Sequence, residues 1–433
     1  GDFELLLCHG TVCVVGKIRD LILQLSKSSI YSTKPFIRCN AIMNITSYIG
    51  LSQELVIFLL VALLCSITLF ISPLVGLYLT ILYFLFVRTD TLISRFPAEL
   101  YAIVCMSVIS ASIQVGYGHG DDYYNVYIPA YEAVNRGESI FSFFSGGVEF
   151  GLPLFFLILN KLFPGVNYIQ LSGVITFIYS FIFILWVERF FLKYIEDKYK
   201  GVALASLLVF FNYLILVHLM RQSMASLFVL FSLGYFLEKN YRKGVVFFLV
   251  ACICHLSSAV IIPLFMIFFS NKKYLKISVV LFIIFAVISF KFLVGFIVAH
   301  NIFGVATYKM AVYEDDVIET TAGAGFVLHF IVLFLLSRFI RDGSYESYKS
   351  LIFYSCPAYL ILTLIPFASD RLFMPITGFM LGGIFFIFFK KYITVFRILL
   401  VAYCALRFFR LGPFAENIYG LWYNYPWLGS IFV

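Results

Sequence analysis

The chain has 433 residues, of which 62% are hydrophobic and 12% are charged, and its formal net charge is +8 at pH 7. A soluble domain is usually about 45–50% apolar and about 25% charged, so this composition excludes an ordinary soluble protein. A net charge of +8 would suggest nucleic acid binding in a soluble protein. In a membrane protein the positive charges instead report which loops face the cytoplasm, so we expect no nucleic acid partner. Apolar runs such as 279–298 do not alternate in polarity, which predicts an all-α, polytopic integral membrane protein.

The first 42 residues differ from the rest of the chain. They are less hydrophobic, and Met43 stands shortly before the first long apolar run. We interpret residues 1–42 as an upstream, non-native extension and residues 43–433 as a single polytopic membrane domain.

Apolar runs long enough, or nearly long enough, to cross a bilayer recur along this domain. They lie near residues 53–71, 74–87, 98–115, 168–188, 201–218, 222–238, 244–255, 258–270, 276–298, 325–340, 348–366, 372–389 and 392–411. We therefore predict about thirteen transmembrane helices. The stretch 151–163 is apolar but short, and Pro153 and Pro164 bracket it, so we predict a re-entrant or interfacial helix there.

Basic and acidic loops alternate along the chain. The basic loops include Arg88, Arg189, Lys239, Lys272 and Lys390, and the positive-inside rule places them in the cytoplasm. The loops 116–167 and 299–324 are acidic and are predicted to face outward. Ionisable groups at membrane depth are costly, so the few cations on the outer side mark candidate sites. They are Arg136, Lys161, Arg221, Lys309, Arg371, Arg407 and Arg410.

The spacing of His218, Arg221 and Gln222 places them on one face of a helix. His255 lies at the tip of a hairpin, 244–270, whose arms of about 12 residues are too short to cross the membrane comfortably. Arginines that converge in an outward cavity indicate an anionic ligand, because a guanidinium grips phosphate oxygens and keeps its charge. A cavity beside lipid favours an amphipathic anion, such as a lipid-linked pyrophosphate.

Carboxylates in the acidic loop are candidates for work on a sugar hydroxyl. Asp121, Asp122 and Glu149 could each take a proton from the hydroxyl or hold it in register. Tyr123 and Tyr127 could stack on sugar rings, although tyrosines also belong to ordinary membrane interfaces. No cysteine pair has zinc-like spacing, so we expect no metal site and no cofactor.

Each of these candidates also has a structural interpretation. Arg221 could be a helix-end arginine that reaches to the interface, and Arg410 could be a boundary anchor. Arg371 could pair with Asp370, and His255 could cap the hairpin turn. Asp122 could be ordinary solvated loop charge.

The combination of these residues resembles a known family. The matching stretches are Asp121–Tyr127, Glu149–Pro153, Arg221–Ala225, His255–Ala259, Arg371–Leu372 and Trp422–Trp427. Together they resemble the EpsG/Wzy family of bacterial polysaccharide repeat-unit polymerases, which includes O-antigen polymerases, over roughly residues 55–430. The resemblance implies a GT-C-like glycosyltransferase of the bacterial inner membrane that works at the periplasmic face without a bound metal. It would move a growing glycan from undecaprenyl pyrophosphate to the non-reducing end of a lipid-linked repeat unit.

We assign roles to these residues as a hypothesis, and the resemblance also implies a chain-length regulator as a partner. Arg221, Arg371 and Arg410 would hold pyrophosphate with Gln222 and His218 beside them, and His255 would support the pyrophosphate or orient the sugar. The partners would be the undecaprenyl-pyrophosphate-linked oligosaccharide, membrane lipid and a chain-length regulator protein. An O-antigen ligase and a flippase for lipid-linked oligosaccharide are the alternatives, although the sequence shows no internal repeat of the kind common in transporters.

Overall fold

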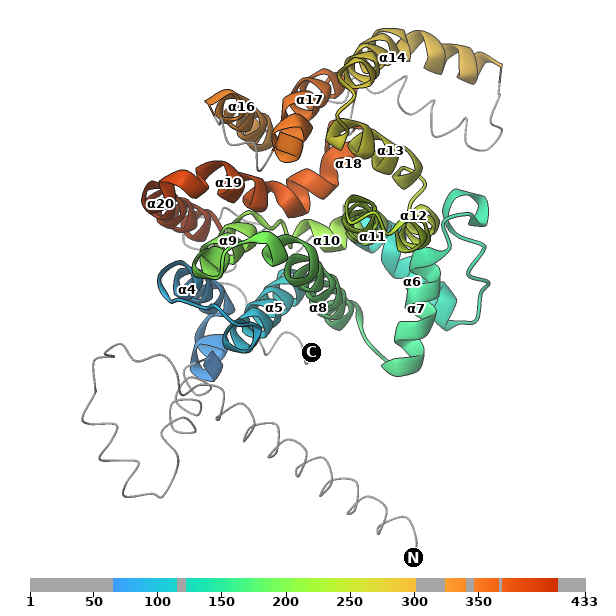
Figure 1. The fold of residues 1–433 in the computed structure, drawn as a ribbon. Coiled ribbons are helices and arrows are strands. Elements are labelled where there is room, and N and C mark those ends of the chain that lie inside the picture. The colour runs from blue at the N-terminus through green and yellow to red at the C-terminus, as the bar shows by residue number, and fades with distance from the viewer. Residues whose placement is uncertain (1–64, 115–121, 301–323, 340–345, 366–367, 412–433) are drawn as a thin grey trace, which may run out of the picture. The chain divides into compact units, whose positions relative to one another are not determined.

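The computed structural model describes residues 65–114, 122–300, 324–339, 346–365 and 368–411, and every regular element in these ranges is helical (Figure 1). Four helical segments there are long and apolar enough to cross a membrane, namely Leu92–Gln114, Tyr168–Tyr194, Lys273–Phe290 and Ala368–Leu411. The all-α membrane class is therefore confirmed. The count of about thirteen crossings and the GT-C-like architecture stay predictions, and the proposed extension 1–42 lies outside the described residues.

The first described helices pack as a group. The helix α4 (Pro73–Phe86) contacts α5 (Leu92–Gln114) and α9 (Asp197–Phe210), and α5 lies along α8 (Tyr168–Trp186) (Figure 1). Hydroxyl groups join the apolar surfaces of α5 and α8, because Ser110 and Ser172 hydrogen-bond at 2.9 Å and Thr176 donates to Ser110 at 2.8 Å. Small polar residues of this kind let membrane helices approach closely.

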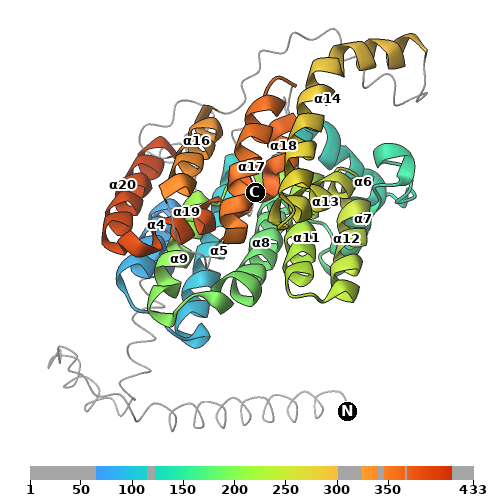
Figure 2. The same ribbon diagram turned by 45° about the horizontal axis from the view of Figure 1, so that its top comes forward.

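A second group carries the predicted hairpin. The helix α11 (Met220–Leu237) packs along α12 (Tyr241–Cys254), and α13 (Ser258–Phe269) contacts both of them (Figure 2). The break between α12 and α13 falls at 255–257, so the helix–turn–helix predicted for 244–270 is confirmed.

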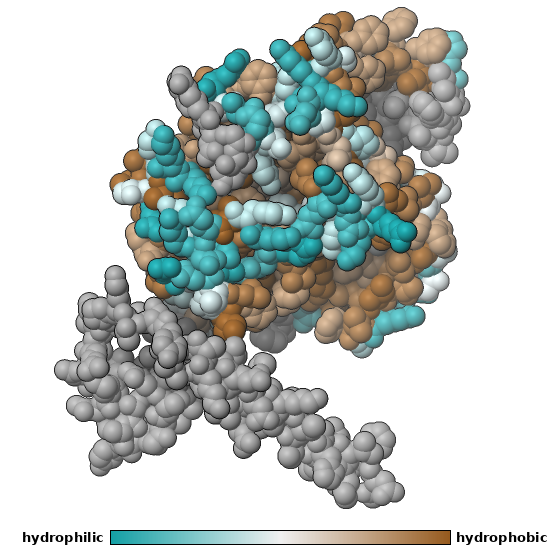
Figure 3. Space-filling view, in the orientation of Figure 1, coloured by the Kyte–Doolittle hydropathy of each residue, from teal (hydrophilic) through white to brown (hydrophobic). Residues whose placement is uncertain are grey.

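Further along the chain, α14 (Lys273–Ala299) contacts α17 (Glu346–Leu362), which also packs on α16 (Ala324–Phe339). One face of α14 is strongly exposed and carries Phe282, Phe285, Ile288 and Phe292, which are 65–77% exposed. Figure 3 shows hydrophilic residues in a band across the face turned to the viewer, with hydrophobic residues around it. An exposed apolar surface of this extent suits a protein surrounded by lipid.

A nearly continuous helical segment closes the core. It consists of α18 (Ala368–Met374), the π-helical turn η6 (Pro375–Met380) and α19 (Leu381–Phe389), and α20 (Ile393–Leu411) follows. The helix α19 packs on α9, where a side chain at Gly382 would collide with the backbone oxygen of Ser206. Only glycine therefore allows this close approach.

Two sequence predictions about the chain around residue 218 are corrected. The span predicted for 201–218 ends at Phe210, and the short helix α10 (Ile215–His218) follows. Leu219 then adopts φ −124° and ψ 51°, which is outside the helical region, before α11 begins at Met220. His218 therefore does not share a helical face with Arg221, because the i, i+3 relationship holds only along an unbroken helix.

The described part of the predicted outer loop 116–167 is largely folded. It contains the π-helical turn η1 (Tyr123–Tyr127), α6 (Ile128–Asn135), the 3₁₀ turn η2 (Phe144–Gly147) and α7 (Gly151–Leu162). The helix α7 occupies the stretch predicted to be re-entrant or interfacial; the helix is confirmed, and its placement in the membrane stays a prediction. The helices α6 and α7 pack together, with the Tyr131 and Phe156 rings edge to face at 5.4 Å.

A buried ion cluster ties the first turn of α5 to η3 (Val187–Phe191), the π-helical turn that follows α8. The Arg95 guanidinium is 2.9 Å and 2.7 Å from the two carboxylate oxygens of Glu188, and it also lies 3.7 Å from Glu99. Arg95 can be buried because the two forked N–H groups of its guanidinium find a bidentate carboxylate partner on the neighbouring helical segment.

Candidate functional site

Segments that are distant in the sequence enclose one small polar cavity. Its volume is about 140 Å³, several times the roughly 30 Å³ that one water molecule occupies in the liquid. It is lined by Asp122, Tyr127, Ser145, Glu149, Leu219, Arg221, Gln222, His255 and Arg371. The fold thus brings seven of the residues predicted from the sequence to one place, and their chemical roles stay predictions.

Glu149 lies at the centre of the hydrogen bonds in this cavity. Its Oε2 accepts from Arg221 Nη1 at 2.6 Å. Its Oε1 lies 2.8 Å from His255 Nδ1 and also accepts from the backbone N–H of Leu256 at 2.9 Å. The Glu149 side chain is only 2% exposed, so a buried carboxylate is satisfied by donors from two other segments of the chain.

Local structure places Glu149 against the hairpin tip. Gly151 lies two residues further on, at the start of α7, and a side chain there would come within 2.8 Å of the Cys254 sulfur and 3.0 Å of its Cα. On the other side, Ser145, Gly146 and Gly147 have φ values of 50°, 65° and 88°, which makes a tight left-handed turn. The turn and the close contact together direct the Glu149 carboxylate toward His255.

The surroundings of Glu149 keep it ionised. Burial on its own would raise the pKa of this carboxyl from its ordinary 4.5. The hydrogen bonds from His255 and Leu256 and the charge of Arg221 outweigh burial and lower the pKa of Glu149 to about 2. A carboxylate this acidic is a poor general base near neutral pH.

The contact with Glu149 also fixes the imidazole of His255. An ionised carboxylate only accepts hydrogen bonds, so Nδ1 of His255 must carry the proton in their 2.8 Å contact. That assignment leaves Nε2 for a ligand, as an acceptor when the ring is neutral and as a donor when it is protonated. His255 is the C-cap of α12, and its backbone N–H donates to the backbone oxygen of Ala251. The residue therefore both ends the helix and presents its side chain to the cavity.

Arg221 combines a packed guanidinium with unused hydrogen-bonding capacity. Its guanidinium carbon lies 4.2 Å from the centre of the Phe144 ring, a cation–π contact that holds the plane of the group. Its Nε is buried and has no hydrogen-bond partner among the described residues. The buried phenol of Tyr127 lies near this charge: burial raises the pKa of Tyr127, and Arg221 partly offsets that effect.

Arg371 reaches the cavity from α18. Its backbone oxygen accepts a hydrogen bond from the side-chain amide of Gln222, which joins α18 to the first turn of α11. The preceding Asp370 accepts a hydrogen bond from Tyr359 of α17 at 2.7 Å. Hydrogen bonds from α11 and α17 thus hold two neighbouring residues of α18, and they fix the backbone from which the Arg371 side chain extends.

Asp122 contributes a second carboxylate to the cavity. It is exposed at the start of η1, and it forms no hydrogen bond or ion pair with the residues that the structure describes. Its neighbour Asp121 lies outside the described residues. The two described carboxylates therefore differ in kind, because Glu149 is saturated by protein donors and Asp122 is open to a ligand.

Three other predicted residues lie elsewhere. Tyr123 is fully buried, and its hydroxyl donates to the backbone oxygen of Tyr168. His218 ends α10 and does not line the cavity. Arg410 is exposed on α20, a helix that packs on α4 and α9.

The sequence did not point to several residues that shape the cavity. Phe144 and Ser145 come from a stretch that reads as plain loop, and the Leu256 N–H contributes through its backbone alone. The pair of glycines after Ser145 was the one available signal, because consecutive glycines mark a tight turn.

Comparison with known proteins adds one finding. A model of the EpsG family matches residues 99–427, which agrees with the resemblance inferred from the motifs. No curated protein and no solved structure matches the chain significantly. Since the family match covers more than half of its length, this multi-pass membrane protein belongs to the EpsG family, the family of Wzy-type polysaccharide polymerases.

Proposed function

We propose that this protein is an O-antigen or related polysaccharide polymerase, a glycosyltransferase of the bacterial inner membrane. It would transfer a growing glycan from undecaprenyl pyrophosphate to the non-reducing end of a lipid-linked repeat unit. The observation that carries this proposal is the shared cavity of Arg221, Arg371, His255 and Asp122, organised by Glu149. Cations and an open carboxylate in one place suit a reaction between an anionic leaving group and a hydroxyl nucleophile.

The two arginines are the proposed pyrophosphate contacts. Arg221 donates one N–H to Glu149, and its other N–H groups, including the buried Nε, are available to a ligand. A donor that is already desolvated and held in place loses little freedom when an oxyanion binds. Arg371 would add a second positive charge and His255 a ring nitrogen that faces the cavity, so fixed protein groups would stabilise the leaving group. We expect this chemistry to need no metal ion.

Asp122 is the proposed proton acceptor. The acceptor sugar's hydroxyl oxygen attacks the anomeric carbon of the donor glycan, and a new C–O bond forms there. The bond from that carbon to the pyrophosphate oxygen breaks, and its electron pair leaves with undecaprenyl pyrophosphate. The hydroxyl proton moves to Asp122, which nothing in the described chain already occupies. Glu149 is the positioning residue, because both of its oxygens serve Arg221 and the hairpin tip.

The membrane arrangement belongs to the same proposal. The basic loops indicate that the cavity opens toward the periplasm, where the lipid-linked repeat units would be presented. About thirteen crossings and a GT-C-like architecture fit this arrangement. The partners would be the undecaprenyl-pyrophosphate-linked oligosaccharide, membrane lipid and a chain-length regulator.

An O-antigen ligase and a flippase remain the rival functions, and reconstitution separates all three. Purified protein is incubated in detergent with the undecaprenyl-pyrophosphate repeat unit, with EDTA present, and the products are resolved on a gel. We expect a ladder of products spaced by one repeat unit. A product formed only when a core oligosaccharide is added would indicate the ligase. Movement of the lipid across proteoliposome membranes without any ladder would indicate the flippase. A ladder that EDTA abolishes would contradict metal-independent chemistry.

A further inference from the structure

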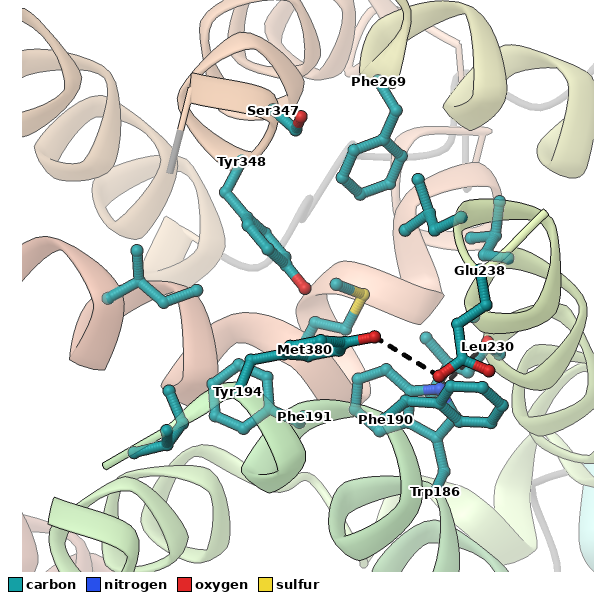
Figure 4. A pocket seen from close by; sticks show the side chains of 15 residues that line it. Trp186, Phe190, Phe191, Tyr194, Leu230, Glu238, Phe269, Ser347, Tyr348 and Met380 are labelled. Atoms are coloured by element: carbon teal, nitrogen blue, oxygen red, sulfur yellow. Dashed lines mark hydrogen bonds between the residues drawn. The ribbon is translucent and has the colours of Figure 1, made fainter. Parts of the chain in front are cut away.

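A second cavity is shown in Figure 4. Whereas the candidate site uses the first turn of α11, this cavity is lined by the C-terminal part of that helix. It has a volume of about 390 Å³, which is within the usual range of roughly 300–1,000 Å³ for a small-molecule site. The candidate site uses Arg221 in the first turn of α11, whereas this cavity uses Glu238 at the C-terminal end. The helix has 18 residues and is therefore roughly 27 Å long, so the two cavities lie near opposite ends of a helix about as long as the hydrocarbon core of a bilayer is thick.

The interior of the second cavity is apolar and firmly built. Trp186, Phe190, Leu230 and Met380 contribute apolar surfaces from three separate segments (Figure 4). The indole N–H of Trp186 donates to the backbone oxygen of Leu230 at 2.9 Å, which fixes the ring in the wall. An apolar hollow with fixed walls can accept a hydrocarbon chain without rearrangement.

Charge is concentrated at the edge of this cavity. Glu238 accepts from Arg189 through both oxygens at 2.8 Å each, and from Lys193 at 2.8 Å. Tyr194 also donates to Glu238 at 3.3 Å. The hydrogen bonds from Arg189 and Lys193 lower the pKa of Glu238 to about 2, so it stays ionised. Two cations against one anion leave this edge with one net positive charge.

The surrounding charges do not cancel that excess. Glu346 lies beside Ser347 at the far rim, but it is paired with Lys349 at 3.6 Å. Arg189 and Lys193 are 44% and 49% exposed, so both can face an additional anion while they hold Glu238. These residues belong to the basic loops that the positive-inside rule places in the cytoplasm, next to the anionic leaflet.

We propose that this cavity binds an anionic phospholipid of the cytoplasmic leaflet. One acyl chain fills the space beside Trp186, and the phosphate lies against Arg189 and Lys193. The apolar interior accounts for the chain, and the net positive edge accounts for the selection of an anionic headgroup. This inference depends on the orientation of the basic loops and is independent of the polymerase reaction.

Tryptophan fluorescence can test the proposal directly, because Trp186 is in the cavity wall. The chain has three tryptophans, and Trp422→Phe with Trp427→Phe leaves Trp186 as the single reporter. Bromine atoms on an acyl chain quench a tryptophan that they contact. The purified protein is titrated with brominated phosphatidylglycerol and, separately, with brominated phosphatidylcholine. Since one basic residue near a membrane surface is worth about 1 kcal/mol, we expect half-maximal quenching at roughly fivefold less of the anionic lipid.

Matched variants assign the preference to the edge charges. Lys193→Gln should remove most of the preference for phosphatidylglycerol, and Glu238→Gln should increase it. Arg242→Gln is the control, because Arg242 is an exposed cation of the same basic region that, among the described residues, forms no hydrogen bond to Glu238, whereas Lys193 does. Ser347→Phe, at the exposed rim, should weaken quenching by both lipids.

Several results would overturn the proposal. Equal quenching by the two lipids would mean that only the acyl chain is recognised. An unchanged preference in Lys193→Gln would place the headgroup elsewhere, and no quenching by either lipid would show that the cavity does not take a chain. Relief of quenching by undecaprenyl phosphate at lower concentration than by unbrominated phosphatidylglycerol would assign the cavity to the polyprenyl carrier instead.

Discussion

The Oε1 atom of Glu149 lies 2.8 Å from Nδ1 of His255, although 106 residues separate the two in the chain. The same carboxylate holds Arg221 through its other oxygen. One buried side chain therefore sets both the ring orientation of a histidine and the position of an arginine. This arrangement predicts that Glu149 acts by organising its neighbours, and that it does so without giving up or taking a proton during the reaction.

Removal of the Glu149 carboxylate should damage both the fold and the reaction. Glu149→Ala leaves the partly buried Arg221 guanidinium and the N–H groups of His255 and Leu256 without their acceptor, which should cost about 3 kcal/mol of stability. We expect a lower thermal unfolding midpoint in detergent and at least a tenfold loss of polymer synthesis. Glu132→Ala is the matched control, because Glu132 is an exposed carboxylate on α6 that forms an ion pair with exposed Arg136 at 3.9 Å. Equal effects of the two substitutions would contradict the proposed role.

The stability that Glu149 contributes should depend on pH in a defined direction. Its pKa falls from 4.5 to about 2 in the folded protein, so folding favours the ionised form. The contribution is fully present above about pH 4.5 and is lost as the pH falls toward about 2. The difference in unfolding midpoint between the wild type and Glu149→Gln should be constant from pH 7 to 5 and should shrink by pH 3. A difference that grows on acidification would have the wrong sign.

Gly151 should be sensitive to the addition of a single methyl group. The Cβ of Gly151→Ala would lie 2.8 Å from the Cys254 sulfur and 3.0 Å from its Cα, so α7 must move away from α12. We expect polymer synthesis to fall by several-fold because Glu149 moves with α7. Gly378→Ala is the control, since its Cβ would be 3.6 Å from Met374, an ordinary contact. Full activity in Gly151→Ala would show that the contact does not position the carboxylate.

Tyr359 should influence Arg371 from a distance. Tyr359→Phe removes the 2.7 Å hydrogen bond to Asp370. This loss should destabilise the first turn of α18 by about 1–2 kcal/mol. We expect weaker binding of the pyrophosphate-linked donor, seen as a higher KM with a smaller change in kcat. The loss should be largely absent when Arg371 is already replaced by alanine, because both substitutions act on the same contact. Additive losses in the double variant would separate Tyr359 from Arg371.

Much of the architecture could be predicted from the sequence, because hydropathy alone locates the long apolar helices. Runs such as 276–298 and 392–411 correspond closely to α14 and α20, since a helix is the simplest way to satisfy backbone groups in lipid. The motif residues Arg221 and His255 were also found from sequence, because ionisable groups are rare at membrane depth.

Other features depend on packing between distant segments and could not be read from the sequence. The break at Leu219 gives no hydropathy signal, and its neighbours would continue a helix by local propensity. Glu149 looked equivalent to Asp122 until the fold surrounded it with three donors. The buried state of Tyr123 follows from the folding of a segment that reads as an acidic loop.

The central claim is that the cavity around Arg221 holds the pyrophosphate of the donor, and one comparison tests it most directly. Arg221→Ala and Arg136→Ala are purified and supplied with the undecaprenyl-pyrophosphate repeat unit. Arg136 is the matched control, because it is an outer-loop arginine with a 63% exposed side chain. We predict that Arg136→Ala makes the wild-type ladder and that Arg221→Ala, at the same protein level, makes none. A normal ladder from Arg221→Ala would contradict the account.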